Sequence, residues 1–255
     1  MTALENKVAL VTGGNRNIGR ETALALASRG ADVVITYHQQ QHSAEQTVQD
    51  LQALGVRAKA IQVDLTGTTE LGRFIQDFNE VLTEWDRSDF DILINNAGTL
   101  RLGTFDNITE DDLDTIYNVN YKSIFFLVQN LMNQIVDGGR IINLGSGTAK
   151  IAFAPLVSYG PLKAALQSLT LYLASFLGSR KITVNAVAPG GLDDDFNAVL
   201  FNEMMPQARD YIASSTAVGR VGLPNDIGNV IAFLCTDEAS FISGAILPID
   251  GGYHL

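Results

Sequence analysis

Short runs of Val, Ile, Leu and Ala recur through the chain, and helical segments separate them. The runs are continuous rather than alternating, which is typical of strands buried on both faces of a sheet. Strands that alternate with helices favour a parallel sheet with helices on both faces. The sequence therefore predicts an α/β fold in three layers, with a parallel sheet between two layers of helices. The seven expected strands are Lys7–Thr12, Ala31–Tyr37, Arg57–Val63, Asp91–Asn95, Arg140–Leu144, Lys181–Ala188 and Ala245–Ile249.

The segments between these runs are expected to form helices. A pattern that resembles a capping box at Thr109 predicts the start of a long helical region to about Val136, which Gly138-Gly139 ends. Ser43 is the candidate N-cap of an earlier helix. The other expected helical segments are Arg20–Arg29, Ser43–Leu54, Thr68–Thr83, Ser158–Leu177, Pro224–Leu234 and part of a polar insertion over Asp193–Thr216.

Composition narrows the class of protein. The 255 residues show no compositional break, which is consistent with a single domain over residues 1–255. The net charge of −11 and the lack of a basic stripe argue against a nucleic-acid surface, and they provide no attraction to an anionic membrane. The single cysteine, Cys235, excludes an internal disulfide and a cysteine zinc cluster, so no metal site is predicted and a reduced cytoplasm is the expected compartment. Neither a signal pattern nor a run of roughly 18 apolar residues is present.

Glycines and polar residues gather where the expected strands end. Ligands of an open α/β sheet bind beyond the carboxyl ends of the strands, where the strand order reverses. The first strand leads into a glycine-rich turn, Gly13 to Gly19, and then a helix, an arrangement in which backbone N–H groups can face a phosphate. Because the residues follow six different strands, one shared ligand site is predicted at this edge. The others are Tyr37, His38, Asp64, Asn95–Gly98, Ser146, Pro189 and Gly190.

Tyr159 and Lys163 are spaced i, i+4, which places both side chains on one helix face, one turn apart. A phenol with a pKa of about 10 is a poor acid–base group at neutral pH. A neighbouring ammonium lowers that pKa because it favours the phenolate. With a pKa lowered to about 7, the pair is a plausible proton donor and acceptor for a carbonyl–alcohol reaction. The alternative is a surface Tyr and a surface Lys that share a helix face by chance.

Further motifs extend the pattern along nearly the whole chain. They are T-G-x-x-x-x-I-G (Thr12–Gly19), V-D-L (Val63–Leu65), N-N-A-G (Asn95–Gly98), V-N (Val119-Asn120), Ser146 thirteen residues before Tyr159, Y-x-x-x-K (Tyr159–Lys163), N-A-V-A-P-G (Asn185–Gly190) and S-G-A-I-L-P-I-D-G-G (Ser243–Gly252). Each motif is weak alone, but the ordered set is highly specific. Together they resemble the classical short-chain dehydrogenase/reductase family, which implies a three-layer, doubly wound, seven-stranded Rossmann sheet.

The resemblance also implies roles for individual residues. Tyr159 would protonate the carbonyl during reduction, and Lys163 would lower the pKa of Tyr159 and hold the nicotinamide ribose. Ser146 would hydrogen-bond the substrate oxygen, unless it is only a loop hydroxyl. Asn120 would anchor a water that links Lys163 to solvent, unless it only distorts a helix. The expected cofactor contacts are Gly13, Asn15, Arg16, Asn17, Ile18, Gly19, Tyr37, His38, Asp64 (near the adenine), Leu65, Asn96, Ala97, Gly98, Tyr159, Lys163, Pro189, Gly190 and Leu192.

Three positions depart from the family's pattern. Asn17 stands where Gly is usual, and Asn is among the residues that best tolerate the left-handed region. A Gly-Pro step follows Tyr159, and Pro161 is tolerable if the helix begins near Ser158, because the first turn leaves its N–H groups unpaired anyway. Asp194 falls where the family often has a Thr that contacts the nicotinamide carboxamide, which affects that contact but not the fold.

Cofactor preference depends on the end of the second strand. Family members that prefer NAD usually carry an acidic residue there, whereas this chain has Tyr37, so no carboxylate would repel a 2′-phosphate. Arg16 and His38 are candidate cations for that phosphate, and a guanidinium binds phosphate bidentately. NADP(H) is therefore predicted, with NAD(H) as the alternative if Arg16 is only a solvated loop charge.

The leading hypothesis for function is an NADP(H)-dependent oxidoreductase that interconverts a carbonyl and a secondary alcohol by hydride transfer, similar to 3-oxoacyl-carrier-protein reductases. The alternatives are a reductase of a small ketone, sugar or polyketide, and a non-catalytic dinucleotide-binding regulator. The presence of Ser146, Tyr159 and Lys163 together argues against the regulator. A substrate lid is expected at about 191–216. Candidates for an apolar or mixed substrate pocket are Ala152, Phe153, Ala154, Leu156, Phe196, Leu200, Phe201 and Met205.

The expected partners are a small-molecule substrate and further copies of the chain, with neither nucleic acid nor membrane. The segments at about 115–136 and 158–177 carry more apolar residues than one sheet-facing side of a helix needs. Similar proteins pair these helices across two-fold axes. The sequence therefore predicts a homotetramer, or a homodimer.

Overall fold

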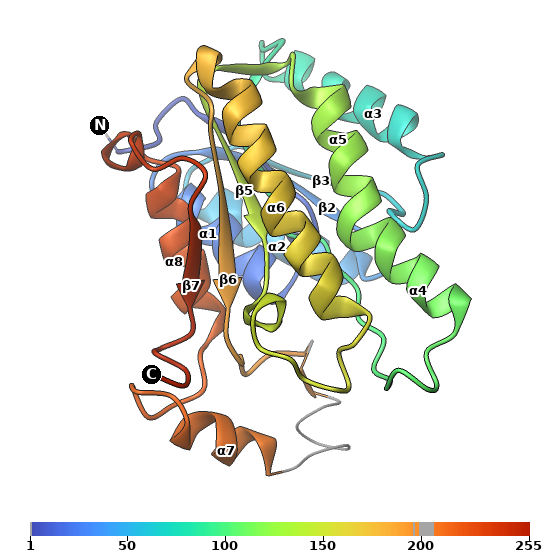
Figure 1. Ribbon diagram of the computed structural model, residues 1–255. Helices are drawn as coiled ribbons and strands as arrows, with labels where there is room; N and C mark the ends of the chain where they lie inside the picture. Colours follow the sequence, from blue (N-terminus) through green and yellow to red (C-terminus); the bar gives the residue numbers. More distant parts are fainter. Residues whose placement is uncertain (1, 196, 199–206) are drawn as a thin grey trace.

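A computed structural model describes residues 2–195, 197–198 and 207–255, and its centre is a parallel seven-stranded sheet (Figure 1). The strand order is β3-β2-β1-β4-β5-β6-β7, so the order reverses between β1 and β4. The predicted doubly wound Rossmann topology is thus confirmed. The strands are β1 (Val8–Val11), β2 (Asp32–Tyr37), β3 (Ala58–Gln62), β4 (Phe90–Asn95), β5 (Ile135–Leu144), β6 (Thr183–Pro189) and β7 (Ile246–Ile249).

Helices cover both faces of the sheet, and each face has its own buried core (Figure 1). One core contains side chains of α1, α2 and α8, and the other contains side chains of α3, α5 and α6. α7 lies beyond the carboxyl ends of the strands. The helices are α1 (Asn17–Ala27), α2 (Gln41–Ala53), α3 (Leu71–Glu84), α4 (Glu110–Tyr117), α5 (Ser123–Leu131), α6 (Tyr159–Leu177), α7 (Ala208–Ser214) and α8 (Pro224–Leu234).

Two helices begin earlier than the sequence predicts. α1 begins at Asn17 rather than Arg20, so the last residues of the glycine-rich turn belong to the first helical turn. α2 begins at Gln41, after an N-cap at Gln40 that makes no side-chain hydrogen bond. Ser43 is therefore inside the helix, and its prediction as the N-cap was wrong. Its carbonyl oxygen instead accepts a hydrogen bond from Thr47 Oγ1.

The long helical region predicted after Thr109 contains a π-helical turn in the structure. Thr109 forms the expected capping box with Asp112. After α4, however, the chain makes a π-helical turn over Asn118–Lys122, and α5 then ends at Leu131. The predicted helical region is confirmed from Glu110 to Leu131, but its predicted end at about Val136 was wrong, because Ile135 and Val136 already belong to β5. The pattern of apolar residues also does not reveal the extra residue that a π-helical turn contains.

The Gly138-Gly139 step lies within β5 and does not end a helix. The pairing of β4 with β5 shifts register between Phe90 and Ile92, which is the irregularity that a β-bulge produces. Gly138 has a φ of 81° in this segment, a conformation that favours glycine. Paired glycines are typical of helix ends and of bulged strands alike, and here they belong to the strand.

Candidate active site

The carboxyl ends of the strands open into one cleft with a volume of about 1280 Å³. All the residues that the sequence predicts to contact the cofactor line this cleft, as does Ser146. Asn120 lies next to the cleft and is fully buried. The sheet therefore brings the predicted site residues together, although their roles remain predictions.

Hydrogen bonds from Thr12 and Asn96 fix the glycine-rich turn to the end of β4. Thr12 Oγ1 accepts from the backbone N–H groups of Asn96 and Ala97, each at 3.0 Å. The Asn96 side-chain amide donates to the carbonyl oxygens of Thr12 at 2.8 Å and of Gly13 at 3.0 Å. No local pattern assigns this role to Thr12, because the role depends on β4, and Asn96, which follows β4, is 84 residues later in the chain.

The backbone of the turn is shaped for close approach. Asn17 has a φ of 49°, which confirms that asparagine adopts the left-handed conformation where glycine is usual. Gly13 has a φ of 62°, and a Cβ at Gly19 would collide with the Gly13 carbonyl oxygen. The N-cap residue of α1, Arg16, makes no side-chain capping bond. The turn and the first N–H groups of α1 therefore fit the pyrophosphate of a dinucleotide.

The charges beside β2 distinguish Arg16 from His38, the two residues predicted to bind the 2′-phosphate. Arg16 is exposed and lines the cleft. It forms no salt bridge within 4.0 Å among the described residues, although its positive charge acts to lower the pKa of the Asp194 carboxyl. His38 Nε2 instead lies 3.7 Å from Asp64 Oδ2. Tyr37 ends β2 where a carboxylate would oppose a phosphate. Arg16 is thus better placed than His38 to bind an additional anion.

A buried polar network holds α6 against the sheet. The Asn95 side-chain amide donates to Asn143 Oδ1 at 2.8 Å, and the Asn143 amide donates to Thr170 Oγ1 at 2.9 Å. This network links β4, β5 and α6. α6 begins at Tyr159, so Pro161 is in the first turn, where its missing N–H removes no helical hydrogen bond, as predicted.

Tyr159 and Lys163 are both buried, with exposed fractions of 9% and 2%. The Lys163 amine donates to the carbonyl oxygen of Leu144 at 2.7 Å. Its nitrogen lies 5.4 Å from the centroid of the Tyr159 ring. The alternative of a surface pair is therefore wrong.

The expected fall in the pKa of Tyr159 does not occur in the ligand-free protein. Burial raises the pKa of the phenol above its usual range, and the carboxylate of Asp194 raises it further. Burial also lowers the pKa of Lys163 to about 7, which weakens the positive charge that was expected to favour the phenolate. Desolvation opposes both charged forms, and here it outweighs their mutual attraction.

Asn120 lies in the π-helical turn, and its amide nitrogen donates to the carbonyl oxygens of Thr99 at 2.9 Å and Ile116 at 3.0 Å. Its Oδ1 is buried and accepts no hydrogen bond from the described residues. A Cβ placed on Gly98 would lie 2.9 Å from this oxygen and 3.8 Å from Lys163 Nζ. The acceptor and the amine therefore flank Gly98, an arrangement that suits the predicted water between them.

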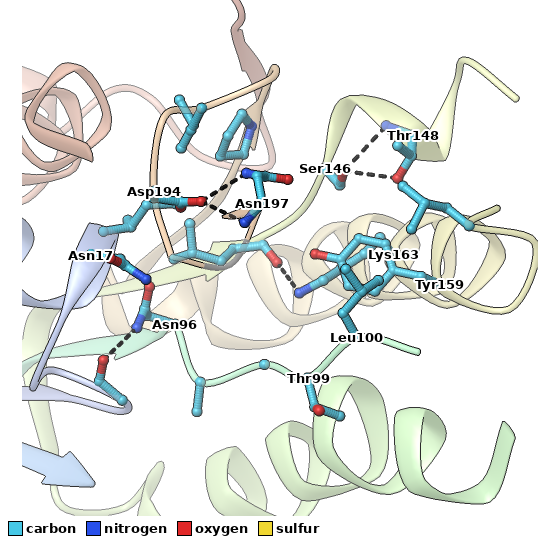
Figure 2. Close-up of a pocket in the computed structure, with 18 of the residues that line it drawn as sticks. Asn17, Asn96, Thr99, Leu100, Ser146, Thr148, Tyr159, Lys163, Asp194 and Asn197 are labelled. Atoms are coloured by element: carbon cyan, nitrogen blue, oxygen red, sulfur yellow. Dashed lines mark hydrogen bonds between the residues drawn. The ribbon is translucent and has the colours of Figure 1, made fainter. Parts of the chain in front are cut away.

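Asp194 also lines the cleft, on the side opposite Tyr159 and Lys163 (Figure 2). Its Oδ1 accepts from the backbone N–H of Asn197 at 2.9 Å and from the Asn197 side-chain amide at 2.8 Å. Burial raises the pKa of the Asp194 carboxyl despite these two bonds. Asp194 is therefore part of the cleft wall.

Three further aromatic residues line the cleft, and no sequence motif indicates them: Tyr211, Tyr253 and His254. The ring centroids of Tyr253 and His254 are 4.1 Å apart, and those of Tyr211 and His254 are 6.2 Å apart. The His254 backbone N–H donates to Ser215 at 3.0 Å, which holds this segment beside α7. No local pattern indicates this cluster, because it forms only when distant segments meet.

The predicted substrate pocket is partly described. Ala152, Phe153 and Leu156 line the cleft, whereas Ala154 is not among the lining residues. Phe196, Leu200, Phe201 and Met205, with the corresponding part of the predicted lid, lie outside the described residues. Within the described part of the chain, no helix is long and apolar enough to span a membrane, and no group of three or more His, Cys, Asp or Glu residues is arranged to hold a metal ion.

Comparison with known proteins identifies the family. A family model described as enoyl-(acyl carrier protein) reductase matches residues 13–254. The chain belongs to the short-chain dehydrogenase/reductase family. Hydroxynaphthalene reductase-like protein Arp2 of Metarhizium brunneum is 35% identical over 260 residues, covering 98% of this chain and 96% of the relative. Versicolorin reductase 1 of Dothistroma septosporum is 36% identical over 258 residues with the same coverage of both chains.

Solved structures agree with this assignment. LugOII, described as a promiscuous reductase that catalyses keto-reduction at C1 during lugdunomycin biosynthesis, is 36% identical with a TM-score of 0.93 over 100% of both chains. The angucycline C-6 ketoreductase LanV with bound NADP is 35% identical with a TM-score of 0.94, covering 99% of this chain and 97% of LanV. This short-chain dehydrogenase/reductase is therefore an NAD(P)-dependent enzyme acting on CH–OH or carbonyl groups, as predicted.

Proposed function

We propose that this enzyme uses NADPH to reduce a ketone on a polyketide-type, fused-ring substrate to a secondary alcohol. The observation that carries the proposal is the aromatic cluster of Tyr211, Tyr253 and His254 in the wall of the cleft. The four relatives and structures compared above are named as reductases, and LanV acts on an angucycline. Both observations favour a flat, ring-containing substrate.

Aromatic side chains in the wall of a cleft select for shape. Tyr211 is 56% exposed although it lines the cleft, so its ring has a free face for a ligand. Stacked or edge-to-face ring pairs contribute about 0.5–1.5 kcal/mol beyond the area that they bury. A rigid ring system gains this contribution at little entropic cost, whereas a flexible acyl thioester must be ordered first. The 3-oxoacyl thioester is therefore the alternative substrate.

NADPH is favoured over NADH by the charges around the end of β2. Arg16 is exposed beside the glycine-rich turn, and no acidic residue occupies the position of Tyr37. Because the whole chain carries a net charge of −11, a phosphate needs a local cation. LanV, which was solved with NADP, supports the same choice.

The residues of the site divide the chemical work. When bound, the dinucleotide supplies the hydride for the carbonyl carbon. Tyr159 carries its phenolic proton at neutral pH, so that proton is available for donation to the carbonyl oxygen. Ser146 donates a hydrogen bond to the same oxygen. Lys163 holds the ribose, and it receives protons through a water bound at Asn120 Oδ1.

A substrate panel tests the proposed function. The purified enzyme is mixed with NADPH and with β-tetralone, acetoacetyl-CoA or acetone, and consumption of NADPH is followed by absorbance. The expected order of kcat/KM is β-tetralone, then acetoacetyl-CoA, then acetone. A higher kcat/KM for acetoacetyl-CoA than for β-tetralone would overturn the fused-ring assignment. Equal rates with NADH and NADPH would overturn the cofactor preference.

Oligomerisation and location complete the proposal. α6 exposes Leu171, Tyr172 and Phe176, and α5 exposes Phe125 and Phe126. Adjacent apolar side chains of this size favour burial against another subunit. A homotetramer, or a homodimer, would cover them. A cytoplasmic location stays a prediction from the single cysteine.

A further inference from the structure

The hydroxyl of Ser146 is tied to Thr148, two residues later in the same loop (Figure 2). Ser146 Oγ accepts a hydrogen bond from the Thr148 backbone N–H at 3.2 Å. The two side-chain oxygens, Ser146 Oγ and Thr148 Oγ1, are 2.8 Å apart, so one of the hydroxyls donates to the other. Both residues line the cleft.

The donors and acceptors of the Ser146–Thr148 pair show which direction of their hydrogen bond leaves Ser146 able to bind a substrate. A serine hydroxyl has one proton and two acceptor sites. The Thr148 N–H occupies one acceptor site of Ser146, and the Thr148 hydroxyl occupies the other if it donates. The Ser146 proton then has no partner within the loop and is directed to the cleft. In the opposite direction, the Ser146 proton is spent on Thr148 and cannot reach a ligand.

The first turn of α6 holds Thr148 in place. A Cβ on Gly160 would lie 2.7 Å from the Thr148 carbonyl oxygen, closer than ordinary contact distance. The loop therefore rests directly on the turn that carries Tyr159. Because Gly160 lacks a side chain, the Ser146–Thr148 pair and the Tyr159 phenol belong to one packed unit.

We infer that Thr148 is a positioning residue. Its hydroxyl donates a hydrogen bond to Ser146 Oγ, which leaves the Ser146 hydroxyl free to donate a hydrogen bond to the substrate oxygen. The inference rests on the proposed ketone reduction. It gives Thr148 no direct contact with the reacting atoms. Its effect must therefore pass through Ser146, which distinguishes it from a residue that only stabilises the loop.

Kinetics of two Thr148 variants provide the first test. Thr148→Val keeps the shape of the side chain and removes the hydroxyl, and Thr148→Ser restores the hydroxyl. With NADPH and β-tetralone, we expect Thr148→Val to lower kcat by about 3- to 10-fold, the effect of one neutral hydrogen bond, and Thr148→Ser to recover most of the loss. Thr83→Val, at an exposed threonine of α3 that does not line the cleft, is the control and should leave kcat unchanged.

A double-mutant cycle separates positioning from structure. In a Ser146→Ala background, Thr148→Val should change kcat by less than about 1.5-fold, because the group through which it acts is gone. Single-turnover rates at high enzyme concentration keep the slow variants measurable. Calorimetric binding of β-tetralone to the enzyme with NADP⁺ gives a readout without turnover. There the valine variant should weaken ketone binding only when Ser146 is present.

The outcomes are distinguishable. If the wild type reduces β-tetralone but the losses from Thr148→Val and Ser146→Ala multiply, the inference is overturned and the proposed function stands. If Thr148→Ser is as slow as Thr148→Val, or the control Thr83→Val is equally slow, the hydroxyl does not act through Ser146. If the wild type neither reduces nor binds any ketone of the panel, the proposed function and the inference both fail.

Discussion

The amine nitrogen of Lys163 lies 5.4 Å from the centroid of the Tyr159 ring, and both side chains are almost completely shielded from solvent. Shielding favours the uncharged form of each group, so the phenol keeps its proton and the amine is readily deprotonated near neutral pH. Reduction needs a phenol that begins the reaction protonated, and Tyr159 meets that need, but its raised pKa also makes it a weaker acid in the ligand-free protein.

Removing the phenolic hydroxyl should abolish proton donation while keeping the ring. Tyr159→Phe is expected to lower turnover of β-tetralone by about 100-fold or more, the usual scale for loss of a general acid. NADPH binding, measured by fluorescence titration, should stay close to that of the wild type. Similar turnover in the variant would show that Tyr159 is not the acid. Tyr172→Phe, at an exposed tyrosine of the same helix, is the control.

The buried amine should make stability depend on pH. Burial lowers the pKa of Lys163 from 10.5 to about 7, so between these values the unfolded chain binds a proton that the folded chain does not. The free energy of unfolding therefore rises with pH across this window. As pH falls from 10.5 to about 7, the stability of the folded protein with an uncharged Lys163, relative to the unfolded chain, is progressively lost. Relative to Lys163→Met, the ligand-free wild type should gain roughly 1 kcal/mol per pH unit.

Urea unfolding at about pH 7 and about pH 9 measures this difference. Lys150→Met, at an exposed lysine, is the matched control and should follow the wild type at both pH values. If the Lys163→Met variant has the same pH dependence as the wild type, the amine does not titrate in this window.

Much of the site follows from local sequence. Each buried run predicts a strand, and residues that follow parallel strands share one edge of the sheet. The sequence alone therefore predicts that Gly13, Asn96 and Ser146 lie at the same edge. The left-handed Asn17 and the start of α6 before Pro161 follow from backbone sterics alone. Such inferences succeed because they depend on a few adjacent residues.

Other features depend on packing between distant segments. The pKa of Tyr159 is raised by burial and by the charge of Asp194, and neither effect can be read from the spacing of residues in the sequence. The cleft position of His254 depends on its bond to Ser215. Gly138 illustrates a different limit, because the same residue type serves a helix end or a bulge, and pairing with β4 decides between them.

Arg16 should discriminate between the two dinucleotides. A hydrogen bond to a charged group contributes about 1.5–3 kcal/mol, so Arg16→Ala should weaken NADPH binding by roughly 10- to 150-fold. NADH lacks the 2′-phosphate and should lose much less. Arg20→Ala is the matched control, because Arg20 is already paired with Glu21 and Asp50. Michaelis constants for both cofactors test this, and an equal loss for both would reduce Arg16 to a general loop charge.

Tyr211 should matter for ring-containing substrates only. Tyr211→Ala is expected to raise the KM for β-tetralone by about 2- to 10-fold, the effect of one lost ring contact, and to leave the KM for acetone unchanged. Tyr211→Phe keeps the ring and should behave like the wild type. An equal rise for both ketones would point to a distorted cleft rather than a lost stacking surface.

The exposed face of α6 should carry a subunit contact. Tyr172 and Phe176 are 74% and 67% exposed, one turn apart. Replacing both with Glu would bury charge in a contact, so we expect the assembly to dissociate. Light scattering at micromolar concentration should give a tetramer or dimer for the wild type and a smaller species for the variant. A monomeric wild type would contradict the prediction.

The π-helical turn at Asn118–Lys122 sets a constraint on chain length. It inserts one residue between α4 and α5, and each residue of a helix advances the side-chain direction by about 100°. Deleting one residue would turn Ile124 and Leu127 away from the core and would displace the Asn120 amide from Thr99. Substitutions within this turn can be absorbed one side chain at a time, whereas a change in its residue count would disturb the core and the site together.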